Sequence, residues 1–267
     1  MSVAQAFLKR DFFNAISYRA DFAMQFVGIL FSVATFYFLS QLFGDAVEPQ
    51  LEAYGGDYFA FVLIGLAFSG FMGLSLSSFA SSIREGQVMG TLEIMLASPT
   101  RLSVVLLSSS LWSSIMVIFR VMVFLLVGAL IFKAGLAKAN ILSALVMLIL
   151  SITSFSSIGI LSAAFVLILK KGDPVTRIFG GVSSLLAGVY YPTSVLPDWL
   201  EPLSRFLPLT YALDGLRLTI LKGYSLSQIP LDLFVLLAFS LVLTPLALLV
   251  FRQALRKAKM DGSLTQY

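Results

Sequence analysis

Long apolar runs alternate with short polar segments along the 267 residues of this chain. Six apolar runs can be delimited, at about residues 22–43, 58–80, 104–132, 141–169, 174–191 and 231–251. Most of them reach the roughly 20 residues that a helix needs to cross about 30 Å of hydrocarbon. A transmembrane barrel would instead need short segments of alternating polarity, and none are visible. The pattern predicts an all-α integral membrane protein with six transmembrane helices.

The segment before the first run, residues 1–21, predicts an interfacial helix. Apolar residues at helical spacing, among them Phe12 and Ile16, share one side, while Arg10, Asn14 and Asp21 share the other. Such a helix lies along the surface of a membrane leaflet. A basic flank that only sets the topology is the alternative.

The fifth run, residues 174–191, is the shortest, because eighteen residues at 1.5 Å each give about 27 Å. Residues 192–222 follow it and combine aromatic residues with repeated prolines, which favours short broken helices that re-enter the outer leaflet. Asp214 and Arg217 are three residues apart and are expected to pair across one turn. A seventh span through residues 203–221 is disfavoured because it would carry charged side chains into lipid at a cost of several kcal/mol.

Basic residues set the expected orientation. They gather in the segments that are cytoplasmic if the N-terminus is cytoplasmic, namely Lys9, Arg10, Arg19, Arg84, Arg101, Lys170, Lys171, Arg177, Arg252, Arg256, Lys257 and Lys259. The positive-inside rule then places both termini, including the tail at 252–267, in the cytoplasm. This bias accounts for the net charge of +4 without a nucleic-acid partner.

Two of the runs carry small and hydroxyl residues. Gly65, Ser69, Gly73 and Ser77 recur at intervals of four, and the fourth run contains Ser151, Thr153, Ser154, Ser156, Ser157, Gly159 and Ser162. Small residues let helix backbones approach closely within lipid, and hydroxyls bond across helices. Both runs are therefore expected to face protein, either within this chain or across a dimer. A cavity-lining role of the hydroxyls is the alternative.

Arg120 is a charged residue deep within an apolar run. Its burial near the middle of a membrane costs about 2.5–3.5 kcal/mol on insertion scales, so it is expected to face the bundle interior or a hydrated path. We assign it to a translocation path, or to contact with an anionic head group or with a partner in a second subunit. Pairing with backbone carbonyls, or a position from which the side chain reaches the interface, is the alternative.

Residue types exclude several kinds of chemistry. The chain has no His and no Cys, so histidine bases, thiol nucleophiles and zinc sites of the usual kind are excluded. It also has no Gly-Lys dipeptide, and therefore no phosphate-binding P-loop. The chain cannot hydrolyse ATP by that route, and we expect no metal site and no bound cofactor.

A charged segment at residues 81–101 separates the second and third runs and is expected to dock a partner. Thr91 can cap a short helix in which Leu92 and Leu96 share an apolar face, and Pro99 ends it. Gly86 and Gly90 permit a turn before that helix. A plain amphipathic helix on the membrane surface is the alternative.

The order of these features resembles the permease subunits of type-2 ATP-binding cassette (ABC) exporters. The resemblance rests on EGQVMGTLEIMLASPTR at residues 85–101 and on YYPTSVLPDWLEPLSRFLPLTYALDGLR at residues 190–217, together with the six runs. It implies a transport subunit that is not itself an enzyme, which forms a homodimer and works with two copies of a separate ATPase that binds ATP and Mg²⁺. It further implies export of a lipid, glycolipid, polysaccharide or drug across a bacterial cytoplasmic membrane.

The same resemblance assigns roles to residues. A coupling helix would contain Arg84, Glu85, Gly86, Gly90, Thr91, Leu92, Glu93, Leu96, Pro99 and Arg101. An outer gate would contain Tyr190, Tyr191, Pro192, Pro197, Trp199, Pro208, Tyr211, Asp214 and Arg217. A secondary transporter or channel should carry intramembrane acids and repeated halves, and a lipid-modifying enzyme should carry clustered acids or histidines. The sequence shows neither pattern.

Overall fold

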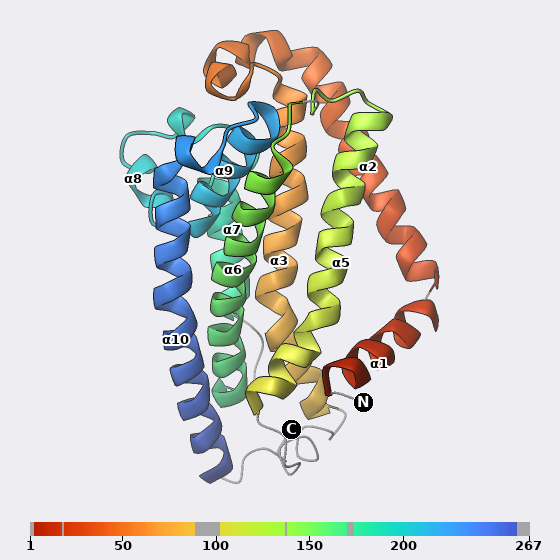
Figure 1. Cartoon of the computed structure of the whole chain (residues 1–267), viewed down its shortest axis with the longest axis vertical. Helices are drawn as coiled ribbons and strands as arrows, with labels where there is room; N and C mark the ends of the chain where they lie inside the picture. Colours follow the sequence, from red (N-terminus) through yellow and green to blue (C-terminus); the bar gives the residue numbers. More distant parts are fainter. Residues whose placement is uncertain (1–2, 18, 89–101, 137, 170–173, 261–267) are drawn as a thin grey trace.

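The computed structural model describes residues 3–17, 19–88, 102–136, 138–169 and 174–260, and its regular elements are helices (Figure 1). Four long helices run side by side: α3 (Tyr58–Val88), α5 (Leu102–Leu130), α6 (Ile141–Leu169) and α10 (Pro230–Met260). A fifth, α2 (Arg19–Val47), leans away from them. The all-α prediction is confirmed for the described part of the chain.

The two ends of the bundle differ in what covers them. The short helix α1 (Val3–Ser17) and the last turns of α10 lie at one end, which we call the α1 end (Figure 1). At the opposite end, the α9 end, lie the 3₁₀ helix η1 (Glu48–Tyr54) and the helices α8 (Glu201–Ser204) and α9 (Pro208–Leu221). The α9 end is therefore built from segments far apart in the sequence.

The expectation of six transmembrane helices is met in part, and for the shortest of the six it stays a prediction. Within the described residues, five helices are long and apolar enough to cross a membrane: α2, α3, α5, α6 and α10. The fifth apolar run forms α7 (Pro174–Leu186), whose 13 residues span about 20 Å. The helix stops there because Gly188 takes a φ of +78°, a left-handed conformation that favours glycine and ends helices.

Helix α1 packs against α5 near the α1 end. The ring of Phe12 meets the edge of Trp112, with 5.8 Å between the ring centroids. Phe12, Phe13 and Ile16 nevertheless remain exposed on the chain. An apolar, exposed flank is what an interfacial helix presents to lipid, although the location of α1 at an interface stays a prediction.

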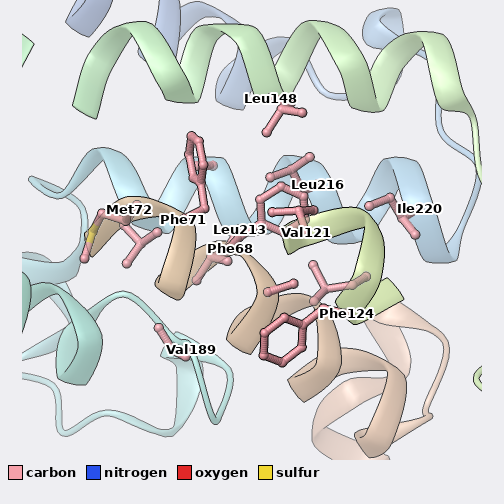
Figure 2. Close-up of a cluster of buried hydrophobic side chains, with 14 of the residues drawn as sticks. Phe68, Phe71, Met72, Val121, Phe124, Leu148, Val189, Leu213, Leu216 and Ile220 are labelled. Atoms are coloured by element: carbon pink, nitrogen blue, oxygen red, sulfur yellow. The ribbon is translucent and has the colours of Figure 1, made fainter. Parts of the chain in front are cut away.

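The main core lies between α3, α5, α6 and α9 (Figure 2). Phe68 and Phe71 of α3 point toward Leu213 and Leu216 of α9, and Leu148 of α6 closes the cluster. The apolar face predicted for α9 is buried in this core, with Leu209, Leu213, Leu216 and Ile220 as its members. Helix α9 is thus held by the bundle and is not a loosely attached surface helix.

The hydroxyl residues of α6 join it to α10. The Oγ atoms of Ser154 and Ser240 are 2.9 Å apart, and Ser157 Oγ is 2.8 Å from Thr244 Oγ1. On another side, a Cβ added at Gly159 would lie 2.8 Å from the carbonyl oxygen of Ser75, so glycine allows the close approach of α3. The prediction of helix packing is confirmed for Ser154, Ser157 and Gly159, whereas Ser151 and Thr153 donate to carbonyls of α6 itself.

Candidate functional site

The predicted outer gate forms an irregular segment between α7 and α10. After Gly188 the chain passes through Pro192, the 3₁₀ helix η2 (Thr193–Val195) and α8 to α9, which begins at Pro208. Proline suits that first position because its fixed φ matches the helix and its missing N–H would have no helical partner. The chain reaches the α9 end through α7 and leaves it through α10 (Figure 1). The segment thus covers one end of the bundle without crossing it.

Arg217 ties this segment to α3. The side chain is 2% exposed, and its guanidinium donates hydrogen bonds to the carbonyl oxygens of Phe61 at 3.3 Å and Val189 at 3.0 Å. It also stacks over the ring of Phe61, 3.4 Å from the centroid. Burial lowers the pKa of Arg217 to about 9, so the guanidinium stays charged at neutral pH. One side chain therefore joins α9, α3 and the turn after α7.

Gly65 makes room for this junction. A Cβ added at Gly65 would overlap the carbonyl oxygen of Val189 and would lie 2.8 Å from Nη2 of Arg217. The first of the small residues predicted on α3 therefore serves a contact between this helix and the segment that joins α7 to α10. Nothing lies within 4 Å of a Cβ added at Gly73. Ser69 and Ser77 donate to carbonyls of their own helix.

Asp214 is paired differently from the expectation. It accepts a hydrogen bond of 2.5 Å from the hydroxyl of Tyr54 in η1. Burial, and then the nearby charge of Asp214, raises the pKa of the Tyr54 hydroxyl, so this group stays a proton donor. The expected ion pair between Asp214 and Arg217 is wrong, because Arg217 points instead to the carbonyls that a buried guanidinium must satisfy.

The other predicted gate residues fall into two groups. Tyr190 stacks on Phe36 of α2 with 5.7 Å between centroids, and Tyr191 donates to the carbonyl of Leu185 at 2.6 Å. Pro192 and Pro208 are buried, and Tyr211 is half-buried. Pro197 and Trp199 are exposed. The structure brings Tyr190, Asp214 and Arg217 to one side of the segment and leaves Trp199 on the surface.

Two polar residues of this end were not singled out from the sequence. Tyr54 belongs to a short loop helix, and Asp232 is 6% exposed in the first turn of α10. Met147 and Asp232 both face Gly215 of α9. An acidic residue two positions after the proline that opens an apolar run was the available signal for Asp232.

Arg120 lies in a separate place, on the side of the bundle formed by α1, α2 and α5. Its Nη2 donates to Oε1 of Gln25 at 2.6 Å, and both side chains line a cavity of about 260 Å³. The expectation that Arg120 faces the protein interior or a polar space agrees with this position. Its role in translocation stays a prediction.

The predicted coupling helix lies mostly outside the described residues. Gly90, Thr91, Leu92, Glu93, Leu96, Pro99 and Arg101 are all in residues 89–101. The described part shows that α3 continues to Val88, with Arg84 exposed and with Glu85 and Gly86 inside the helix. The turn predicted at Gly86 is therefore wrong, because α3 continues through this residue to Val88.

Among the described residues, no group of three or more His, Cys, Asp or Glu side chains is placed to hold a metal ion. A family model described as ABC-2 type transporter matches residues 4–221, from α1 through α9. A comparison with curated proteins gave no match. The chain belongs to the ABC-2 type transporter family and is a multi-pass membrane permease of an ABC transporter. Such a permease in general works with an ABC ATPase.

Proposed function

We propose that this chain is the permease subunit of an ATP-driven exporter that moves an amphipathic substrate outward across a bacterial cytoplasmic membrane. The substrate class comprises lipids, glycolipids, polysaccharides and drug-like molecules. The observation that carries the proposal is the outer segment, which Arg217 clamps over one end of the helices. A cover of this kind suits an exit that stays closed until the substrate arrives.

The orientation follows from the charges. In the proposed topology the α1 end is cytoplasmic, because it carries Arg252, Arg256 and Lys257 at the end of α10 and Lys9 and Arg10 in α1. A cysteine introduced at Ser194 in the outer segment should react with an impermeant reagent from outside. A cysteine introduced at Ser263 in the C-terminal tail should react only from inside. The reverse pattern would overturn the proposed direction.

Two permease copies are proposed to assemble with two ATPase copies. Helices α2 and α7 expose apolar side chains, including Phe31 at 69% and Ile178 at 68%. The outer segment between α7 and α10 covers one end of the helix bundle of a single chain. A substrate path bounded by two copies of the chain is therefore the simplest arrangement. Lipid is the alternative neighbour of these exposed faces. Crosslinking between cysteines introduced at Phe31 and Ile178 in membranes tests for a symmetric pair.

Coupling is proposed to occur through residues 84–101. The variant Leu92→Asp with Leu96→Asp should abolish co-purification of the ATPase, because charges on the apolar face prevent its burial. Glu93→Lys should weaken ATPase binding less, since a single rim charge contributes under about 1 kcal/mol. Glu52→Lys, the same change on an exposed residue at the α9 end, is the matched control.

ATP turnover gives the functional measurement. The permease alone should show no ATPase activity, and the complex in liposomes should hydrolyse ATP and move substrate outward. Normal transport by the double aspartate variant would show that residues 84–101 are not the coupling element. Transport that continues without ATP would favour a secondary transporter.

A further inference from the structure

The cavity beside Arg120 has the features of a ligand site within the membrane. Its volume is about 260 Å³, and it lies between α1, α2, α3 and α5. Polar groups of Gln25, Ser113 and Arg120 face it, and the rest of the wall is apolar, including Trp112 and Phe119. The cavity is larger than the roughly 150 Å³ engineered cavity that accepts benzene. It has room for a small polar group.

The charge of Arg120 defines what that group can be. Its hydrogen-bond acceptor in the structure is the neutral amide of Gln25. Among the side chains that the structure describes, the ion pairs join Arg10 to Asp11 and Arg205 to Glu201, so neither involves Arg120. An arginine at membrane depth needs an anionic or strongly polar partner to offset its insertion cost. A planar guanidinium binds phosphate oxygens well because its N–H groups match their geometry.

The surroundings of the cavity favour a lipid over a soluble anion. Phe26 and Phe119, whose rings are 6.2 Å apart, line the cavity and are 38% and 40% exposed on the chain. Met122, two residues beyond Arg120, is 55% exposed. A head group inside the cavity would therefore leave its acyl chains against the apolar surfaces of α2 and α5. Whole lipid-sized ligands need larger cavities, since small-molecule pockets run to roughly 300–1,000 Å³.

We propose that this cavity binds the phosphate head group of an anionic phospholipid, with Arg120 as the phosphate ligand and Gln25 holding the guanidinium in place. An anionic lipid is favoured over a zwitterionic one because a head-group ammonium would lie beside Arg120 without a described carboxylate to receive it. Lipid binding at this cavity is independent of the direction of transport and of the ATPase, so it stands apart from the proposed export function.

The test measures lipids retained by the full chain. The purified chain is exchanged into nanodiscs that contain equal amounts of phosphatidylglycerol and phosphatidylcholine, then extracted in mild detergent and examined by native mass spectrometry. Wild type should retain phosphatidylglycerol with a preference of about ten-fold, because both lipids offer a phosphate to Arg120 but the choline of phosphatidylcholine adds a second positive charge beside the guanidinium. Arg120→Gln should remove the preference. Arg252→Gln, the same change on an exposed arginine of α10, should keep it.

A second variant leaves the charge in place. Ser113→Phe puts a ring into the cavity and should reduce retention while Arg120 is intact. If Arg120→Gln does not fold, this variant decides the question. Retention of phosphatidylglycerol by Ser113→Phe at the wild-type level would overturn the proposal.

Two further results would contradict lipid binding. Displacement of retained phosphatidylglycerol by soluble glycerol phosphate alone would identify a site for a soluble anion.

Asp21 precedes Gln25 by four residues in the sequence, and an acid there is an internal alternative to the lipid. A chain that shows no lipid preference, and in which Asp21→Asn and Arg120→Gln have non-additive effects on stability, would have an internal ion pair instead.

Discussion

Two arginines, Arg217 and Arg120, occupy opposite kinds of environment in this chain. Arg217 is buried, satisfies two carbonyl oxygens and covers an aromatic ring. Arg120 is half-buried, bonds one amide and faces a cavity. The helices that the two arginines contact differ in the same way. In the most apolar stretch of α3, which Arg217 contacts, 72% of the residues are buried, whereas in that of α2, which Arg120 contacts, 11% are buried.

This difference separates two uses of a charge inside a membrane protein. At the α9 end, the guanidinium of Arg217 forms its hydrogen bonds within the protein and joins α9, α3 and the turn after α7. On the α2 side, the charge remains available because the surrounding structure is open. A charge that is satisfied internally should matter for stability, and a charge that faces a cavity should matter for binding.

The largest effect is expected at Arg217. Arg217→Met leaves the carbonyl of Val189 without its guanidinium donor, at about 1–3 kcal/mol, and it also removes the charge-assisted bond to Phe61 and the contact with its ring, although the Phe61 carbonyl keeps its helical partner in α3. The free energy of unfolding should therefore fall by about 3 kcal/mol in a detergent unfolding titration. Arg205→Met, which breaks only the exposed pair with Glu201, should change it by under about 1 kcal/mol. Equal losses of stability in the two variants would show that burial of Arg217 gives it no special role in the fold.

The next effect is expected at Gly65. Gly65→Ala places a methyl group against the carbonyl of Val189, and such overpacking costs about 1–3 kcal/mol. Gly70→Ala is the matched control on the same helix, because nothing lies within 4 Å of its added Cβ. It should be neutral or slightly stabilising, since alanine favours a helix over glycine. The same unfolding titration distinguishes them, and a stable Gly65→Ala variant would contradict the close contact.

Tyr54→Phe should cost about 1–2 kcal/mol at neutral pH, because Asp214 loses a hydrogen-bond donor. The raised pKa of Tyr54 means that the folded chain holds this proton more tightly than the unfolded chain. The resulting stability is present below the ordinary tyrosine pKa of about 10 and is lost as the pH rises above it. The variant should therefore lose less stability than wild type between neutral and strongly alkaline pH. Parallel pH profiles of the two would speak against the hydrogen bond.

The smallest effect on stability is expected at Arg120. Arg120→Gln removes one hydrogen bond to an amide beside an open cavity, so the free energy of unfolding should change by under about 1 kcal/mol. The unfolding titration and the lipid measurement on the same preparation sharpen the contrast with Arg217. A loss of stability as large as that of Arg217→Met would show that Arg120 has a structural role.

The sequence predicted the elements that depend on local pattern. The apolar runs located the five long helices, and the spacing of Leu209, Leu213, Leu216 and Ile220 predicted the buried face of α9. The end of α7 was harder to predict from the sequence, because residues 187–191 stay mostly apolar although the backbone turns at Gly188. Hydropathy reports composition, whereas a glycine in a left-handed conformation decides where a helix stops.

Contacts between distant segments were not predictable in the same way. The hydrogen bond from Tyr54 to Asp214 joins residues 160 positions apart, and no local pattern encodes it. The sequence suggested Asp214 as the partner of Arg217, because the helical spacing of the two residues is visible in a sequence. The carbonyl oxygen of Val189, which the turn after α7 presents to Arg217, is not visible there. Of the predicted coupling residues, only Arg84, Glu85 and Gly86 fall within the described part of the chain.

The short helix α7 has a consequence for how the chain enters a membrane. The machinery that inserts helices responds to the summed hydrophobicity of a segment about 19 residues long, and α7 offers 13 residues that include Gly180, Gly181, Ser183 and Ser184. Its neighbours in the finished bundle, including the core that Phe179 joins, must hold it in place. We therefore expect the five long helices to insert segment by segment, and α7 to enter the membrane only together with the bundle that holds it.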